Sequence, residues 1–466
     1  MRKKIKNSTN NLTINEDIVC PKELKDKFKL WILRSLIKLN GINDFVGKYG
    51  NFDNDNLALL LGLEEYIDSD DIDKKEIYDI LKKDLVRYEK RVRFSSNKIL
   101  INNIKKISKL TGLNQDEEKI LEFVILLKQY DILEVTTNYF GRELNSNHVI
   151  KILSVILDIP HDSVKKALSP NSIFIKSSLI YFYKRVTNSL EGKLELLEDD
   201  FADKMLQEID DIKDLFSNIL TSTTSSTLKI DDYSHIKENL DLVIPYLKNA
   251  KLTKAKGVNI LIYGEPGTGK SELCKLLAKK TNSALYEVSY NDQDNEPIEG
   301  KERLKAYKCS QYLLAKENIM LMFDEIEDVL HSDNYRQKNK AWINKMLETN
   351  EIPTIWITNS VHSIDDAIIR RFDFSIELTI PNKERRIEIL KDYTNEFLKE
   401  EKVLEIAEHN DLSPAIISKA SNVIKSLNIN DNDKSQAFTL LLNNTLKAQG
   451  FREIKEKKKQ QENSIP

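Results

Sequence analysis

Apolar residues recur with the period of an amphipathic helix through the first part of the chain, from residue 1 to about 220. Apolar side chains at i, i+3, i+4 and i+7 place one face of a helix against a core. The pattern is clear in four segments: FKLWILRSLIKL, KEIYDILKKDLVRYEKRV, EEKILEFVILL and FADKMLQEIDDIKDLF. It predicts a mostly helical N-terminal domain over residues 1–220.

The segment HVIKILSVILDIPHDSVKKAL predicts two helices joined by a tight turn, with Asp162 and Ser163 at the start of the second. The run SIFIKSSLIYFY, residues 172–183, then favours a pair of strands. One interpretation is a winged-helix-like segment that could read DNA, and the other is plain helical packing. No stripe of Lys and Arg marks a recognition helix, so we favour packing.

The hydrophobic pattern changes after TSTTSST at residues 221–227, which contains no apolar residue and predicts a linker over 221–234. Beyond it lie short β-rich runs separated by helix-like sequence: VNILIYG, SALYEVS, IMLMFDE, PTIWITN and FSIELTI. Alternating apolar strands and helices predict a mostly parallel sheet covered on both faces. Residues 235–380 are therefore expected to form an α/β domain, an αβα sandwich.

Helical periodicity returns at Pro381 and continues to about Gly450. It predicts a small domain of four helices over residues 381–450, in which Ser413 and Pro414 suit the N-cap and first position of the third helix. The last residues, 451–466, are charged and predict a tail that frays.

The composition narrows the function classes. The 466 residues carry a formal net charge of −3, so no global basic field favours nucleic acid or an acidic membrane. Cys20, Cys274 and Cys309 lack the spacing of a metal or redox motif, which fits a reducing cytosol. No apolar segment follows the basic start MRKKIK, and the longest apolar runs fall far short of the ~20 residues of a membrane helix. We expect a cytoplasmic protein without a membrane segment.

The strongest motif is GEPGTGKS, which fits the phosphate-binding pattern G-x-x-x-x-G-K-[ST] between a strand and a helix. Glycine lets the loop curl so that its N–H groups face an anion, and the start of the next helix adds positive charge. Lys270 is expected to reach the β- and γ-phosphates, and the Ser271 hydroxyl to bind Mg²⁺. The residues expected to bind ATP are Gly264, Glu265, Pro266, Gly267, Thr268, Gly269, Lys270, Ser271 and Glu272.

A second motif is the apolar run IMLMF, which ends in Asp324 and Glu325. Carboxylates at the end of a buried strand need a reason, because burying charge is unfavourable. Beside the phosphate loop, Asp324 is expected to bind the nucleotide's Mg²⁺ through water, and Glu325 to polarise the attacking water as general base. Glu327 and Asp328, which follow, are expected at the surface.

A third motif is PTIWITN, in which Asn359 ends an apolar strand. An amide at that place can orient the lytic water and sense the γ-phosphate. Arg370 and Arg371 follow in the segment IDDAIIRRFD.

Residues from about 235 to 450 resemble the AAA ATPase family. GEPGTGKS matches its Walker A motif, MLMFDE its Walker B motif, ITN its sensor 1, and IDDAIIRRFD its second region of homology. The resemblance implies ATP with Mg²⁺, a P-loop αβα core with a C-terminal helical lid, and a homo-oligomeric ring, most often a hexamer. The chain is also similar to bacterial single-AAA proteins that carry a helical N-terminal region.

The resemblance further implies that Arg370 or Arg371 acts as an arginine finger on a neighbouring subunit's ATP. The best-known members have two residues between these arginines, whereas here they are adjacent, so either can be the finger. Members that thread proteins carry an aromatic-hydrophobic-Gly step after the second strand. This chain has Ile298-Glu299-Gly300 in an acidic loop, with Tyr290 close to the strand, so threading by aromatic stacking is in doubt.

Three functions are weighed on these motifs. The first is an ATPase that remodels a protein client captured by the N-terminal region, and we rank it first. The second is an ATPase acting at DNA, a loader or defence effector, which an exposed basic face around Lys151, Lys165 and Lys166 would favour. The third is an ATP-gated assembly switch, against which an intact general base argues.

Overall fold

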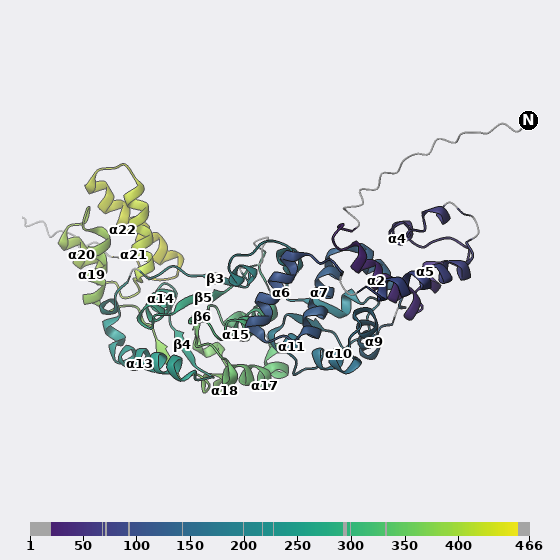
Figure 1. Ribbon diagram of the computed structural model, residues 1–466. Coiled ribbons are helices and arrows are strands. Elements are labelled where there is room, and N and C mark those ends of the chain that lie inside the picture. The colour runs from purple at the N-terminus through teal and green to yellow at the C-terminus, as the bar shows by residue number, and fades with distance from the viewer. Residues whose placement is uncertain are drawn as a thin grey trace, which may run out of the picture. The chain divides into compact units, whose positions relative to one another are not determined.

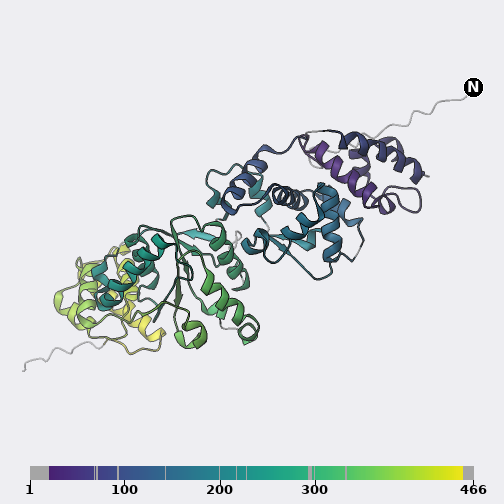
Figure 2. The ribbon, with the colours of Figure 1, turned by 60° about the horizontal axis from the view of Figure 1, so that its bottom comes forward.

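The computed structural model describes residues 20–454, except residues 68, 70–71, 92–93, 142, 199, 217, 227, 292–295, 299 and 331–332. The chain divides into two compact units (Figures 1 and 2). The first comprises Met1–Asn218 with Lys305–Lys316, and the second Ile219–Leu304 with Glu317–Pro466. Helix α15 (Gly300–Leu313) therefore contributes residues to both units. Nothing in the local pattern indicates this division, because α15 lies between two strands of the αβα domain.

The first unit is mostly helical, as the apolar periodicity predicts. Four of its helices start where an asparagine side chain accepts from a free backbone N–H group, at Asn54, Asn97, Asn114 and Asn145. Asn114 also forms a capping box with Glu117. Its helices are α2 (Lys25–Lys38), α3 (Ile42–Phe45), α4 (Asp55–Leu61), η1 (Glu64–Tyr66), α5 (Lys74–Glu89), α6 (Lys98–Thr111), α7 (Gln115–Gln129), α8 (Asp131–Asn138), α9 (Ser146–Leu157), α10 (His161–Ala167), α11 (Ile173–Ser177), η2 (Glu191–Lys193), α12 (Phe201–Met205) and η3 (Ile212–Phe216).

Helices α9 and α10 form the predicted helix-turn-helix, but the strand pair expected over residues 172–183 is not present in that form. Ser172 caps helix α11 by accepting a hydrogen bond from the Ile175 N–H, so the first half of the segment is helical. Only β1 (Ile180–Phe182) is a strand, and its antiparallel partner is β2 (Leu194–Leu196), which follows later in the chain. A cap outweighs local β-propensity here, since it satisfies backbone donors that a helix start leaves free.

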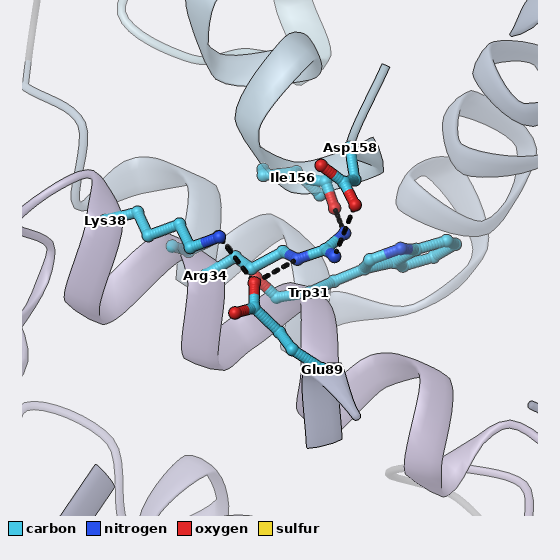
Figure 3. A network of polar contacts seen from close by, with 7 residues as sticks. Trp31, Arg34, Lys38, Glu89, Ile156 and Asp158 are labelled. Atoms are coloured by element: carbon cyan, nitrogen blue, oxygen red, sulfur yellow. Dashed lines mark hydrogen bonds and ion pairs between the residues drawn. The ribbon is translucent and has the colours of Figure 1, made fainter. Parts of the chain in front are cut away.

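A buried arginine joins three helices of the first unit (Figure 3). Arg34 on α2 donates from Nη1 to the carbonyl oxygen of Ile156 on α9 at 2.8 Å and pairs through Nη2 with Asp158 at 3.2 Å. Its Nε lies 3.4 Å from the carboxylate of Glu89 on α5, which also pairs with Lys38. The guanidinium therefore fixes α2 against both α5 and α9.

The second unit contains a sheet of six strands in the order β3-β5-β6-β7-β4-β8. All neighbours are parallel except β3 and β5. Side chains of β6 and β7 are buried on both faces, which requires layers of helices on both sides. This confirms the predicted αβα sandwich. The strands are β3 (Leu220–Ser222), β4 (Asn259–Tyr263), β5 (Ala284–Val288), β6 (Ile319–Phe323), β7 (Thr354–Thr358) and β8 (Phe374–Glu377).

Figure 1 shows this sheet among its helices. Helices α13 and α14 pack on it through a core that includes Leu247, Leu277 and the strand residue Ile260. The non-strand elements of this part are η4 (Ile230–Ile236), α13 (Lys237–Thr253), α14 (Lys270–Lys280), α16 (Glu327–Leu330), α17 (Asp333–Thr349), η5 (Val361–Ser363) and α18 (Asp366–Ile369).

The predicted linker contains ordered structure. Strand β3 pairs antiparallel with β5, with Thr221 opposite Glu287, and so extends the sheet by one edge strand. Helix η4 follows and buries Tyr233 and Ile236 in the core of the domain. The run of Ser and Thr contains β-branched residues, which suit a strand that is exposed along one edge.

Four helices form the C-terminal part around a core of their own: α19 (Lys383–Thr394), α20 (Glu400–Ala407), α21 (Pro414–Ser426) and α22 (Asp431–Ala448). Helix α21 begins at Pro414 with Ser413 at its N-cap, as predicted. The tail was expected to fray from residue 451. Its first residues do not, because Ile454 is buried in this core and its N–H donates to the Asn443 side chain at 2.7 Å. Within the described part of the chain, no helix has both the length and the apolar character needed to cross a membrane.

Candidate active site

The loop between β4 and α14 adopts backbone angles that favour glycine. The φ angles of Gly264, Gly267 and Gly269 are +141°, +81° and +97°. A Cβ atom at position 264 would lie 2.2 Å from the carbonyl oxygen of Leu378, so no other residue fits there without moving β8. The loop therefore curls closely before α14 starts at Lys270. The N-terminus of this helix and the loop N–H groups form a site for phosphate.

Lys270 spans the mouth of this loop. Its ammonium donates to the carbonyl oxygens of Gly264 at 2.8 Å and Glu265 at 2.9 Å, and to Oδ1 of Asn359 at 2.8 Å. Burial lowers the pKa of Lys270, while Asp324 and Glu327 oppose that shift. The predicted phosphate-binding lysine and the predicted sensor asparagine are thus in direct contact.

Ser271 and Asp324 meet at the carboxyl edge of the parallel strands. The Ser271 hydroxyl donates to Oδ2 of Asp324 at 3.1 Å, and Oδ1 of Asp324 accepts from the Glu325 N–H at 2.8 Å. A hydroxyl and a carboxylate beside a phosphate loop are a donor set that Mg²⁺ prefers. Ser271 and Asp324 would hold the ion, which when bound neutralises charge on the phosphates.

Glu325 is exposed and has a left-handed backbone, with φ of +52°. A residue other than glycine is strained in this region, and such strain is typical of sites whose geometry is held by surrounding contacts. The carboxylate is free to face solvent at the edge that Asp324 shares with Lys270. An exposed carboxylate here can accept a proton from water.

Glu327 was expected at the surface, and the structure corrects this. It is partly buried, and its Oε1 accepts from the Thr358 hydroxyl at 2.5 Å, the Asn359 N–H at 2.6 Å and the Ser360 N–H at 3.4 Å. Glu327 therefore holds the end of β7, where Asn359 contacts Lys270. The sequence carried no signal for this, because Glu327 is 32 residues from Asn359.

The two arginines have different surroundings. Arg371 pairs with Glu348 on α17 at 2.6 Å, and both side chains are 44% exposed. Arg370 follows the last turn of α18 and is exposed, with no ion pair to any residue that the structure describes. The sequence could not distinguish them, since they are adjacent.

The other predicted loop residues have local partners. The Thr268 hydroxyl donates to the carbonyl oxygen of Glu265 at 3.0 Å. Glu272 accepts from Ser226 at 2.9 Å and pairs with Lys275 at 2.7 Å.

The lid lies directly on the phosphate loop. The Ala415 N–H donates to the carbonyl oxygen of Gly267 at 3.2 Å, and Ser413 and Ala415 leave no room for a Cβ at Gly267. A cavity of about 360 Å³ extends from Pro266 and Gly267 along α21 and α22. Small residues of the lid, Ser413 and Ala415, thus face the loop.

Tyr233 is a further residue of the site that the sequence did not indicate. Its hydroxyl donates to the carbonyl oxygen of Gly269 at 3.0 Å, so η4 supports the phosphate loop from the side of the predicted linker. The neighbouring Asp232 pairs with Arg385 of α19 at 2.5 Å, which connects η4 to the lid.

The expected pore-loop segment is only partly visible. Glu299 lies outside the described residues, together with 292–295, while Tyr290 is 59% exposed.

The parallel sheet carries the glycine-rich loop, Ser271 and Asp324 at one edge. This arrangement is typical of a P-loop nucleotide hydrolase. The sequence model of the ATPase family associated with various cellular activities (AAA) matches residues 260–380. Residues 260–380 are therefore an AAA-type P-loop ATPase domain. Domains of this type bind ATP with Mg²⁺ and hydrolyse ATP.

Curated relatives agree with this assignment. The chain is 28% identical over 219 residues to the ATP-dependent zinc metalloprotease FtsH 2 of Thermoanaerobacter sp., covering 43% of this chain and 42% of that protein. It is 31% identical over 180 residues to a proteasome-activating nucleotidase of Methanococcus maripaludis, covering 34% and 42%. The chain thus spans less than half the length of these relatives. The solved FIGL-1 AAA domain in complex with ADP aligns with 54% of this chain and 94% of its own, at 15% identity and a TM-score of 0.37.

Proposed function

We propose that this chain is a subunit of a homo-oligomeric ring, with a hexamer as the expected size, that couples ATP hydrolysis to remodelling of a protein partner. The observation that carries the ring is the contrast between the two arginines. Arg371 is held by Glu348, whereas Arg370 is exposed and forms no ion pair with any residue that the structure describes. A cation left free in this way suits the ATP of a neighbouring subunit, and we assign the arginine finger to Arg370.

The other roles in ATP hydrolysis belong to residues of one chain. Lys270 and the loop N–H groups bind the phosphates, and Ser271 and Asp324 hold the ion. Glu325 accepts a proton from the attacking water, and Asn359 orients that water while its amide oxygen keeps Lys270 in place. An arginine supplied by a neighbour stabilises the negative charge that develops in the transition state, an effect of about 10³- to 10⁵-fold in related systems.

Mixing two inactive variants tests the shared site. Glu325→Gln removes the base but keeps Arg370, and Arg370→Ala keeps the base but removes the finger. In a mixed ring, a site of the Arg370→Ala subunit receives Arg370 from its Glu325→Gln neighbour. We expect ATP turnover to reappear on mixing, and light scattering to show a ring that forms or tightens with ATP. Two inactive proteins that stay inactive when mixed in demonstrable rings would refute the finger assignment.

Arg371→Ala is the matched control, because it removes an arginine with a partner in its own chain. We expect it to retain far more activity than Arg370→Ala. Equal loss in both variants would contradict the distinction drawn from the Glu348 ion pair.

The first unit supports a protein client over DNA. Lys151, Lys165 and Lys166 are exposed, but Asp158 and Asp162 are exposed beside them, so the face is of mixed charge. A cytoplasmic location belongs to the same proposal, since all three cysteines are free thiols. The Glu325→Gln variant with ATP should retain a bound protein that the wild type releases on hydrolysis. Recovery of DNA in its place, sensitive to salt, would favour the DNA-acting alternative.

A further inference from the structure

Arg303 on α15 is an almost fully buried charge, with 1% of its side chain exposed. Its Nη2 donates to the carbonyl oxygen of Asp324 at 2.7 Å, and its Nη1 reaches the carbonyl oxygen of Glu325 at 3.5 Å. Nη1 also pairs with Asp328 at 3.0 Å, and the guanidinium lies 4.5 Å from the ring centre of Phe323. One side chain thus contacts the strand end and both residues that follow it.

These contacts bear on the strained backbone of Glu325. Glu325 has a positive φ, which needs surrounding contacts to persist, and Arg303 holds the carbonyl groups on both sides of that residue's N–Cα bond. The start of α15 approaches the same segment so closely that a Cβ at Gly300 would lie 2.6 Å from the carbonyl oxygen of Asp328. The segment from 324 to 328 is therefore fixed by α15.

Arg303 is also a buried cation among carboxylates of the site, as Lys270 is. Burial lowers its pKa, and Asp328, Asp324, Glu325 and Glu287 act against that shift in this order. The pKa of Glu287 on β5 is raised, first by burial and then by Asp324, and Arg303 opposes this rise. A buried ion pair is by itself weak evidence that a residue is kept for stability. The contacts of Arg303 lie between Phe323 and Asp328, which indicates a geometric role.

We propose that Arg303 is a positioning residue for hydrolysis, which holds the backbone of Asp324 and Glu325 in the geometry that the attack of water requires. The proposal rests on ATP hydrolysis by the AAA domain and does not depend on remodelling or on the arginine finger.

The test compares Arg303→Met and Arg303→Lys in the full chain. Misplacing a base by about 1 Å lowers a rate about 100-fold, so Arg303→Met should lower kcat by roughly 10- to 100-fold. Affinity for a fluorescent ATP analogue should stay within about threefold, since Arg303 does not face the phosphates. Arg303→Lys should recover part of kcat, because a lysine can still donate to the Asp324 carbonyl. Unchanged kcat in Arg303→Met, or a loss of ATP affinity that matches the loss of kcat, would overturn the positioning role.

Discussion

Glu327 offers a sharp test of how the site is held, because it contacts the sensor loop and not the ATP phosphates. Its Oε1 accepts two short hydrogen bonds, from Thr358 and from the Asn359 N–H, and one long one from Ser360. The perturbation is Glu327→Ala, which removes all three. Glu327→Gln is the matched control, since its amide oxygen can still accept them without the charge.

The size of the effect follows from these contacts. A hydrogen bond to a charged group contributes about 1.5–3 kcal/mol, so the two short bonds set a ceiling of roughly 3–6 kcal/mol. Asn359 is exposed, and its freed N–H will bind water, which returns part of this energy. We therefore expect a net loss of about 2–3 kcal/mol in the placement of Asn359, or roughly 30- to 150-fold in kcat. Glu327→Gln should lose about half of that energy, because charge roughly doubles the strength of such bonds.

The assay is steady-state ATP hydrolysis in a double-mutant cycle with Asn359→Ala. If Glu327 acts through Asn359, the double variant should be no slower than Asn359→Ala alone. Losses that multiply would show that Glu327 acts independently of the sensor loop. A kcat within threefold of wild type in Glu327→Ala would refute the reasoning altogether.

Three further predictions concern stability. Arg34→Met removes the charged hydrogen bond to the Ile156 carbonyl oxygen, while the acidic partners of Arg34 can bind water instead. Urea unfolding should therefore show a free energy of unfolding lower by about 2–3 kcal/mol in the first unit, and an unchanged midpoint would contradict this. Gly264→Ala should abolish ATP binding and destabilise the second unit by more than about 2 kcal/mol, because the new Cβ would lie 2.2 Å from the Leu378 carbonyl oxygen. Gly112→Ala is the control, since Gly112 also has a positive φ but open space around it, and we expect it to lower the free energy of unfolding by only about 1 kcal/mol. Burial raises the pKa of Glu198 from 4.5 to about 7, so the folded state binds this proton more tightly than the unfolded state. The free energy of unfolding should therefore fall by roughly 3 kcal/mol as the pH rises from about 4.5 to about 7. Glu198→Gln should flatten this pH dependence and be more stable than the wild type at pH 8. Urea unfolding of both proteins at pH 5 and pH 8 measures this, and the same pH dependence in both would exclude Glu198 as its source.

The sequence by itself determined the features that lie within single continuous segments. Gly264 to Ser271 occupy one strand-loop-helix unit, so their chemistry and their order follow from local spacing. Asp324 and Glu325 end one apolar strand, and Asn359 another. Because parallel strands place their carboxyl ends at one edge, these segments meet without further information.

The tertiary structure decided the contacts between distant residues. Arg303 and Asp324 are 21 residues apart, and Tyr233 and Gly269 are 36 apart, so no periodicity or motif joins them. The difference between Arg370 and Arg371 likewise depends on Glu348, which lies on another helix.

Packing between segments also decided where some of the ordered elements begin and end. Strand β3 exists because β5 offers it an unpaired edge, and Ile454 is buried because the four lid helices leave room for it. Local sequence specifies which groups a segment presents. Which of those groups find a partner depends on packing between segments, since hydrogen bonds and ion pairs form only where the fold brings both atoms within about 3 Å of each other.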